Sequence, residues 1–413
     1  MDERNWAGNL TYGAKALVTP RSLEELQEVV AGTEHVRALG SRHSFTAISD
    51  TDGVLVSVAG LPDCDVVEVD EEAGTASVGA GAAYGAVAVE LERRGWALAT
   101  LASLPHISVA GAVATGTHGS GDSTGSLASA VAGLEYVGAD GELTAIRRGD
   151  PDFDGSVVAL GALGIATRVT LDVEPTYSLR QDVYTGLSWD ALDQHFDEIT
   201  STAHSTSLFT RFDDSAIRQA WFKSRLADPP VETFGAVPAT GPMHMLEDAP
   251  IESVTDQSGV PGPWLGRLPH FRMEFTPSRG AELQTEYLVP RGSGRSAIAA
   301  LRGLSDRMAP ILQVSEIRTV ARDSLWLSSS HDTDVVGFHF TWVLDEPAVY
   351  AVLPAMEAAL LPLGARPHWG KCFVAGAGEL APLYSRWDDF RRLRDRADPA
   401  RKFGNAFLDK VLG

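Results

Sequence analysis

Apolar residues in the first 175 positions recur with helical spacing in some segments and with strand-like alternation in others. Ser22 and Glu25 predict a capping box at the start of a helix whose apolar residues share one face. A second helix is predicted over 84–94, where Gly95 ends it. The predicted strands of this half are 35–39, 54–58, 65–69, 75–78, 134–137, 143–146 and 168–173.

The second half shows the same two periods. Helices are predicted after Ser188, before Pro310, after Asp345 with a kink at Pro354, and over 379–395. The predicted strands here are 285–289, 311–320 and 335–343. Because strands and helices alternate in both halves, the pattern predicts an α+β fold with two mixed sheets.

One long stretch, 228–280, contains nine prolines and little periodicity. A segment of this length is typical of functional loops or of a lid. A domain boundary is expected near Pro175, where the alternating strand 168–173 ends.

Composition narrows the classes of function. The chain has 413 residues, which suits two or three domains, and its 34 Lys and Arg against 55 Asp and Glu give a formal net charge of −21. The sequence has neither a basic stripe nor a basic amphipathic segment, so binding to nucleic acid or to an anionic membrane surface is not expected.

The sequence also bears on location in the cell. Cys64 and Cys372 form no CxxC pair, so neither a disulfide framework nor a cysteine zinc site is expected. Residues 1–10 are polar and charged where a signal peptide needs an apolar stretch, and the apolar stretch 157–166 is too short to span a bilayer. A cytoplasmic protein is expected.

The usual cofactor motifs are missing from the sequence. Residues 79–84 begin like a dinucleotide-binding loop and lack its third glycine, and GxxxxGK[ST] does not occur. A zinc site built from the histidines is the rival chemistry, but the sequence contains neither HExxH nor HxH. No metal is expected.

Small residues dominate the segment 102–121. Such a backbone can lie against a flat ligand or hold a pyrophosphate through its N–H groups without any basic residue. The alternative is a flexible surface loop, but the interleaved Pro105, Ile107, Val109 and Val113 favour a packed segment. The turn that contains His43 follows an apolar stretch, which places this histidine at a strand end, where ligands commonly bind.

Polar residues two positions apart share one face of a strand. Glu316 and Arg318 form one such pair and His339 and Thr341 another, on the next predicted strand. The opposite face of that strand is apolar and consists of Val336, Phe338, Phe340 and Trp342. Lys371 adds a cation after a glycine. For the strand pairs the alternative is a solvated sheet face with an ion pair, and for Lys371 it is an ordinary surface lysine.

Five segments together resemble the vanillyl-alcohol-oxidase-type flavoproteins, and within them most closely the alditol oxidases. These segments are 40–44, 103–121, 161–165, 368–371 and 398–407. The resemblance extends along essentially the whole chain and includes 5–9 and 261–264. It implies an FAD-binding domain of the PCMH type, residues 1–174, a substrate-binding cap with an antiparallel sheet, 175–367, and a C-terminal return to the FAD-binding domain, 368–413.

The resemblance also implies which residues bind FAD. His43 matches the histidine that carries a covalent bond to the 8α-methyl group of the flavin, and Arg42 stands where some relatives have glycine. The remaining positions that match FAD contacts of the family are Gly40, Ser41, Ser44, Ser103, Ser108, Gly111, Thr115, Gly116, Thr117, His118, Ile165 and His368.

The alditol-binding residues of the family match Ser103, Glu316, Arg318, Thr341 and Lys371, with His339 beside them. We expect Lys371 and Arg318 to stabilise negative charge and Glu316 to accept hydrogen bonds from further hydroxyls of the substrate. His339 is an ordinary near-neutral base, whereas Lys371 could act as a base only with a lowered pKa.

The predicted activity is oxidation of the terminal hydroxyl of xylitol, sorbitol or glycerol to the aldehyde, with hydride transfer to FAD and reduction of dioxygen to hydrogen peroxide. An aldonolactone oxidase or dehydrogenase, acting on gulono- or arabinono-1,4-lactone, is the alternative within the fold. A non-catalytic carbohydrate-binding protein is the alternative from another class. We expect a monomer whose partners are a small polyol and dioxygen.

Overall fold

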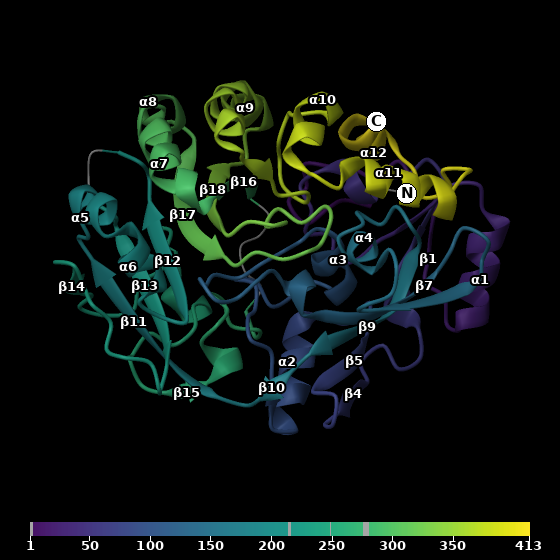
Figure 1. Ribbon diagram of the computed structural model, residues 1–413, viewed down its shortest axis with the longest axis horizontal. Helices are drawn as coiled ribbons and strands as arrows, with labels where there is room; N and C mark the ends of the chain where they lie inside the picture. Colours follow the sequence, from purple (N-terminus) through teal and green to yellow (C-terminus); the bar gives the residue numbers. More distant parts are fainter. Residues whose placement is uncertain (1–2, 214–215, 248, 276–280) are drawn as a thin grey trace.

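The computed structural model describes residues 3–213, 216–247, 249–275 and 281–413. Figure 1 shows a large sheet backed by helices on one side of the molecule and smaller sheets on the other. Helices and sheets occur in both parts, which confirms the predicted α+β class. The prediction of two mixed sheets is wrong, because the described strands form four sheets, one purely parallel and three purely antiparallel. The predicted domain boundaries stay a prediction.

The smaller sheets come from the N-terminal half. A parallel sheet has the order β1-β3-β2, with bounds β1 Ala16–Val18, β2 Val36–Ala38 and β3 Val54–Val56. An antiparallel sheet has the order β4-β5-β9-β7-β8, with bounds β4 Val67–Asp70, β5 Thr75–Gly79, β7 Val131–Val137, β8 Leu143–Arg147 and β9 Ile165–Asp172. A short antiparallel pair joins β6 Trp96–Ala97 to β10 Glu174–Pro175.

Helices of this half are α1 Leu23–Gly32, α2 Tyr84–Arg93, α3 Val109–Ala114 and α4 Phe153–Val157. Only half of the predicted capping box forms at α1. Ser22 Oγ accepts from the backbone N–H of Glu25 at 3.2 Å, whereas the Glu25 carboxylate accepts from the backbone N–H of Arg21 at 2.7 Å. Gly95 follows α2 with φ +81°, a left-handed conformation that glycine adopts at little cost.

Nine described strands form the large antiparallel sheet, and β15 pairs with β11 beside the main order β14-β11-β13-β12-β17-β18-β16-β19. Their bounds are β11 Ser178–Thr185, β12 Ser205–Thr210, β13 Gln219–Arg225, β14 Val237–Pro238, β15 Gly262–Pro263, β16 Glu282–Pro290, β17 Leu312–Val320, β18 Val335–Val343 and β19 Arg366–Pro367. The predicted apolar face of β18 is confirmed, because Val336, Phe338, Phe340 and Trp342 are all fully buried.

Several predicted helices of the second half are divided. The bounds are α5 Trp189–Gln194, α6 Phe196–Ser201, α7 Gly294–Arg302, α8 Ser305–Met308, α9 Glu346–Leu360, α10 Ala377–Leu380, α11 Trp387–Ala397 and α12 Ala406–Leu412. The predicted helix over 379–395 is interrupted at Pro382, which lacks an N–H donor and lies in a 3₁₀ turn. Asp345 caps α9 as predicted, and Pro354 lies inside that helix.

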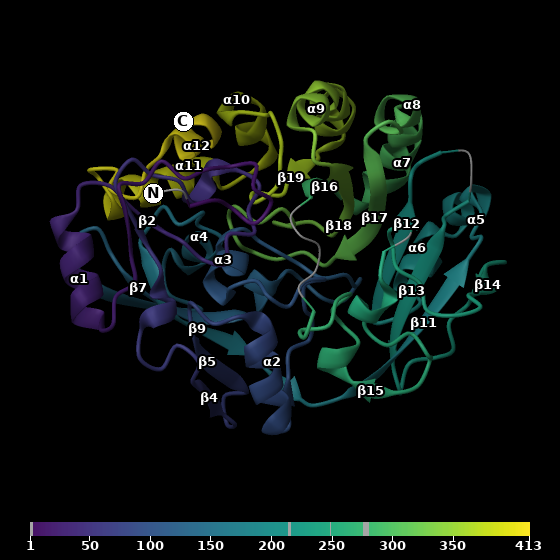
Figure 2. The same cartoon turned by 180° about the vertical axis from the view of Figure 1, so that it is seen from behind.

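The C-terminal segment lies against the N-terminal segment, as both ribbon views show (Figure 1, Figure 2). Asn405 caps α12 with its side-chain oxygen and donates its amide N–H groups to the carbonyls of Ala47, Ile48 and Asp50. The backbone N–H of Val36 donates to the carbonyl of Lys402 at 2.9 Å. These bonds join the chain ends around the loop that contains His43.

Arg37 ties three segments together. Its side chain is 3% exposed and donates to the backbone carbonyls of Gly161, Phe403, Ile48 and Leu160. Burial lowers the pKa of Arg37 to about 10, so the guanidinium still carries its charge at pH 7.

We expect Arg37→Gln to lower the free energy of unfolding by about 3 kcal/mol, because the shorter neutral side chain leaves buried carbonyls unpaired. Urea unfolding followed by tryptophan fluorescence measures this. Arg93→Gln, which removes an exposed ion pair with Glu90, is the control and should change stability little. Equal losses in the two variants would contradict the role of Arg37.

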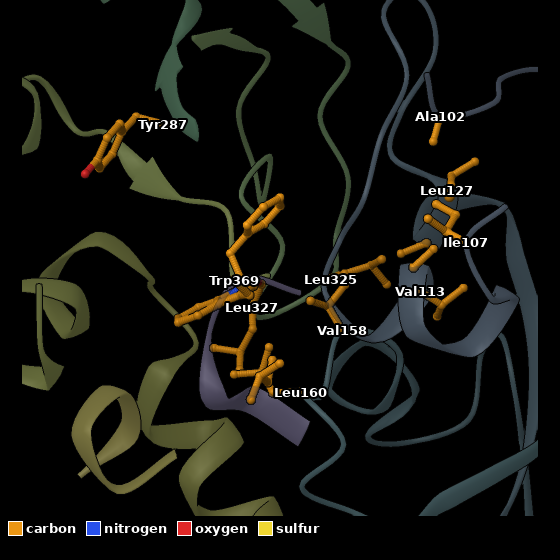
Figure 3. Close-up of a cluster of buried hydrophobic side chains, with 14 of the residues drawn as sticks. Ala102, Ile107, Val113, Leu127, Val158, Leu160, Tyr287, Leu325, Leu327 and Trp369 are labelled. Carbon is orange, nitrogen blue, oxygen red and sulfur yellow. Dashed lines mark hydrogen bonds between the residues drawn. The ribbon is translucent and has the colours of Figure 1, made fainter. Parts of the chain in front are cut away.

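A buried hydrophobic cluster supports the segment that contains His368 and Lys371. Trp369, between them, is fully buried, and its indole N–H donates to the carbonyl of Leu327 at 2.8 Å. Figure 3 shows Trp369 and Leu327 together with Leu160 in this cluster. The neighbouring polar side chains are therefore attached to a rigid part of the core.

The long stretch 228–280 is largely irregular, as predicted, although residue 248 and residues 276–280, with Pro277 among them, lie outside the described residues. It contains short strands and 3₁₀ turns, and parts of it cover the site described below. None of the helices in the described ranges is both long enough and apolar enough to cross a membrane.

Candidate active site

A cavity of about 540 Å³ lies between the N-terminal loops, the large sheet and the stretch 244–275. The N-terminal part contributes the loop 40–45 and residues of the segment 102–118. The sheet contributes side chains from β16, β17 and β18, and the C-terminal segment contributes His368, Gly370 and Lys371.

Three adjacent strands form the polar floor of this cavity, which consists of Glu286, Glu316, Arg318, His339 and Thr341. The strand register places Glu286 and Glu316 on either side of His339. Because side chains two apart share a face, Arg318 and Thr341 join the same surface. The pair on β17 and the pair on β18 that the sequence predicts therefore lie on one surface. The neighbouring strand β16 adds Glu286 to it.

Glu286 is the central carboxylate of the polar floor and is fully buried. Arg318 Nη2 lies 2.5 Å from Glu286 Oε1 and Lys371 Nζ lies 2.5 Å from Oε2. His118 Nε2 is 3.2 Å from Oε1. Burial alone would raise the pKa of Glu286, but Arg318, Lys371 and His118 outweigh it and hold that pKa well below its usual range.

Lys371 also orients His339. Its Nζ lies 2.8 Å from His339 Nδ1, and His339 Nε2 lies 3.2 Å from Thr341 Oγ1. An ammonium can only donate, so Nδ1 accepts and the imidazole proton resides on Nε2. Burial and the charge of Lys371 lower the pKa of His339 to about 4. Burial also lowers the pKa of Lys371, although Glu286 opposes this shift.

Arg318 connects the polar floor to the N-terminal part. Its Nη1 lies 3.5 Å from Ser103 Oγ, and its Nε lies 3.6 Å from Glu316 Oε2. Burial would raise the pKa of Glu316, but Arg318 and His270 lower it, so the carboxylate is ionised at neutral pH. The site therefore buries two cations and two carboxylates together.

The small-residue loops pack against each other on the opposite side of the cavity. Ser41 N–H donates to Ser108 Oγ at 3.3 Å, and Ser108 N–H donates to Ser41 Oγ at 3.1 Å. A Cβ on Gly40 would lie 2.4 Å from Ser108 Oγ, and one on Gly111 would lie 2.7 Å from it. A side chain at either position would have to displace the Ser108 hydroxyl, and with glycine there the backbone itself lines this wall.

His43 lies on this wall and stacks on Trp6, with ring centroids 5.4 Å apart. Burial, with a smaller effect of His106, lowers the pKa of His43 to about 4, so the imidazole is neutral at pH 7. Its Nδ1 is buried and has no hydrogen-bond partner among the described residues. Arg42 has φ +64°, a left-handed conformation that is uncommon for residues other than glycine, and its side chain pairs with Glu3.

Almost every predicted site residue lines the cavity, and two do not. Gly116 lies behind the wall with φ +64°. Ile165 begins β9 and is fully buried against Val137 in the five-stranded sheet. The residues that do line it are Gly40, Ser41, Arg42, His43, Ser44, Ser103, Ser108, Gly111, Thr115, Thr117, His118, Glu316, Arg318, His339, Thr341, His368 and Lys371. Their roles stay predictions.

Sequence reasoning missed Glu286, Trp6 and His270. The signal for Glu286 was available, because Glu286 lies in the predicted strand 285–289 and follows Glu282 and Gln284 at two-residue intervals, and all three line the cavity. The same two-residue rule had identified Glu316 and Arg318. No comparable signal marks His270, which lies in an irregular loop.

Two other chemistries, metal binding and serine hydrolysis, can be compared with the described residues. No group of three or more His, Cys, Asp or Glu side chains there could hold a metal ion. Residues 121–125 do spell GDSTG, a GxSxG sequence, but Ser123 lies in a turn followed by a 3₁₀ helix rather than between a strand and an α-helix. A nucleophile elbow needs that strand–helix context.

Comparisons with known proteins agree with this site. Residues 14–147 match the family described as FAD binding domain, and residues 277–411 match the D-arabinono-1,4-lactone oxidase family. The chain is 46% identical over 411 residues to the alditol oxidase of a Streptomyces species, which covers 99% of this chain and 98% of the relative. The chain belongs to the alditol oxidase family.

Other relatives of this alditol oxidase family member are less similar. An L-gulono-1,4-lactone dehydrogenase of Mycobacterium tuberculosis is 31% identical over 433 residues, 99% of this chain and 98% of the relative. The crystal structure of a cholesterol oxidase from B. sterolicum superposes with a TM-score of 0.77 at 16% identity and covers 99% of this chain and 96% of that one. The last similarity establishes the shared fold.

The cavity of this alditol oxidase family member fits FAD. Gly40 and Gly111 place bare backbone along one wall of the cavity, and bare backbone can bind phosphate through its N–H groups. His43 lines the same cavity, its buried Nδ1 has no hydrogen-bond partner among the described residues, and the polar floor lies across from it. The chain is therefore an FAD-binding oxidoreductase by family and by the shape of its site.

Proposed function

We propose that the chain oxidises the terminal hydroxyl of alditols such as xylitol, sorbitol or glycerol to the aldehyde, with FAD as cofactor. Dioxygen, reduced to hydrogen peroxide, is the proposed final acceptor. The observation that carries this proposal is the polar floor, where two cations and two carboxylates are buried together beside the FAD-binding wall.

The residues of the polar floor suit a neutral polyol. Lys371 and Arg318 would stabilise the negative charge that develops on the alcohol oxygen, and Glu286 holds both cations in place. FAD supplies the acceptor of the hydride that leaves the alcohol carbon. Glu316, Thr341 and Ser103 would hydrogen-bond the remaining hydroxyls.

We assign the hydroxyl proton to the pair formed by Lys371 and His339. Lys371 Nζ already donates to His339 Nδ1 at 2.8 Å. In its neutral form Lys371 would take the proton of the hydroxyl on its lone pair and become an ammonium, which Glu286 stabilises, while it keeps one N–H on His339 Nδ1. The lowered pKa of Lys371 favours this neutral form.

His43 is the proposed site of covalent attachment, through one imidazole nitrogen, to the 8α-methyl carbon of the flavin. A neutral imidazole has a free lone pair, and the low pKa of His43 keeps it neutral. Stacking on Trp6 fixes the ring plane. The unpartnered Nδ1 is the candidate atom.

A second candidate function is oxidation of an aldonolactone. It is favoured by the match of residues 277–411 to the D-arabinono-1,4-lactone oxidase family and by the lactone dehydrogenase relative. The higher identity to the alditol oxidase favours the alditol.

An oxygen electrode and peroxide detection separate these candidates. We expect the purified yellow protein to consume oxygen and form peroxide with xylitol, sorbitol or glycerol, and to show a much lower kcat/KM with gulono- or arabinono-1,4-lactone. A strong preference for a lactone would show that the substrate is an aldonolactone and not an alditol. A colourless protein without a flavin spectrum would contradict both and favour a carbohydrate-binding protein.

A further inference from the structure

A buried lysine lies behind the polar floor and does not line the cavity. Lys223, on β13, is 1% exposed. Its Nζ donates to the carbonyl of Leu268 at 2.5 Å, to that of Pro269 at 3.3 Å and to His270 Nδ1 at 3.1 Å. All three ammonium protons therefore have acceptors, which a lysine needs when it is buried this deeply.

His270 connects this lysine to the polar floor. Its Nε2 lies 2.8 Å from Glu316 Oε1. The rings of Trp221 and Phe209 contact the imidazole edge-on, with centroids 5.1 and 5.7 Å away. The backbone N–H of His270 also donates to the carbonyl of Ser103 at 3.0 Å, which ties this loop to another residue expected to bind substrate.

The three groups fix one another's protons. An ammonium only donates, so His270 Nδ1 accepts and the imidazole proton resides on Nε2. That proton is donated to Glu316 Oε1. Burial and Lys223 lower the pKa of His270 to about 4, so the imidazole between the lysine and the carboxylate is neutral. Glu316 Oε2 makes no hydrogen bond within the described part of the chain and lies 3.6 Å from Arg318 Nε.

We propose that Lys223 and His270 are positioning residues for substrate recognition: Lys223 sets the Nε2–H tautomer of His270, which holds Glu316 so that Oε2 accepts a hydrogen bond from a non-reacting hydroxyl of the polyol. This inference rests on the proposed alditol oxidase function and extends it to His270, which lines the cavity, and to Lys223, which lies outside it. Lys223 acts only through His270, since it touches neither FAD nor substrate.

The charge of Lys223 makes this arrangement sensitive to pH. Burial lowers the pKa of Lys223 to about 7, although Glu316 opposes the shift. The ionisable groups that face it are His270 from the loop and Glu316 and Arg318 from β17, while its cross-strand neighbours, Gln181 and Ser205, carry no charge. The ammonium is lost as the pH rises through about 7, and with it the charge-assisted hydrogen bond to His270 Nδ1, so that Glu316 alone then fixes the tautomer and the imidazole is held less firmly.

The first test compares Lys223→Met with the wild-type holoenzyme and with Lys15→Met, an exposed lysine, as control. We expect KM for xylitol to rise roughly 10- to 100-fold in Lys223→Met while kcat changes less than threefold. The wild-type KM should rise above pH 7, and Lys223→Met should lose this dependence. A wild-type KM that is flat from pH 6 to 8.5, or an unchanged KM in the variant, overturns the proposal.

A second pair of variants covers the case in which Lys223→Met does not fold. His270→Gln keeps an amide donor toward Glu316 and should retain a near wild-type KM, whereas His270→Leu should raise it. Calorimetry with dithionite-reduced holoenzyme under nitrogen gives the Kd of xylitol without turnover and should follow the same order. Equal Kd values for the two variants overturn the proposal, whereas wild-type enzyme without alditol turnover refutes the proposed function itself.

Discussion

Lys371→Met is expected to lower kcat with xylitol by about 10²–10³-fold while the protein keeps its flavin. Methionine retains the length of the side chain but removes the cation that lies 2.5 Å from Glu286 Oε2 and 2.8 Å from His339 Nδ1. The alcohol oxygen then loses both a stabilising charge and its route for the proton. Steady-state oxygen consumption gives kcat, and the visible absorbance of the flavin gives its occupancy.

Lys15→Met is the matched control, because it removes an exposed lysine on the N-terminal part. Its kcat and flavin content should equal those of the wild type. Near-normal turnover in Lys371→Met would remove this lysine from the mechanism. Loss of flavin together with activity would instead assign Lys371 to cofactor binding.

The regular parts of the fold could be predicted because their apolar patterns are local. The strand over 335–343 has the predicted bounds, since the large apolar residues Val336, Phe338, Phe340 and Trp342 recur at every second position of β18. Breaks inside helices were harder, as the division of the predicted helix before Pro310 into α7 and α8 shows. The local signals for these breaks are Gly303, which caps the end of α7, and Pro382, since both residues are poor helix formers.

The site, too, has residues that local patterns predict and residues that only tertiary contacts bring in. Glu316, Arg318, His339 and Thr341 could be placed on one surface because strand geometry determines which side chains share a face. That Lys371 and Ser103 meet them depends on contacts between segments far apart in the sequence. Lys223 would pass for a surface residue in the sequence, and only the register of β13 and the loop 268–270 bring it behind Glu316.

Two predicted cofactor residues show where the resemblance has less support. Ile165 and Gly116 match family positions, yet neither borders the cavity. Gly116 has φ +64°, so glycine is needed there for the backbone turn. Ile165 packs in the core of its sheet, where a large apolar residue is needed in any case. Both positions therefore have structural reasons for their residues that do not involve FAD.

The second large effect is expected for His43→Ala, which should abolish covalent attachment of the flavin. The change removes the unpartnered Nδ1 and leaves the glycine wall and the serine pair of Ser41 and Ser108 in place. FAD should therefore still bind, less tightly, through non-covalent contacts. After acid precipitation the flavin of the wild type should stay with the pellet, and that of the variant should appear in the supernatant or be absent.

His35→Ala is the control, because His35 pairs with Asp52 at the surface, away from the cavity. It should keep all of its flavin in the pellet. If flavin stays with the precipitated His43→Ala variant, the covalent bond must be made by another residue. The lowered pKa and the stacking of His43 would then play no part in flavin attachment. Both variants keep the backbone wall, so they differ only in whether the imidazole of His43 is present. The fraction of flavin in the pellet therefore measures the contribution of that imidazole alone.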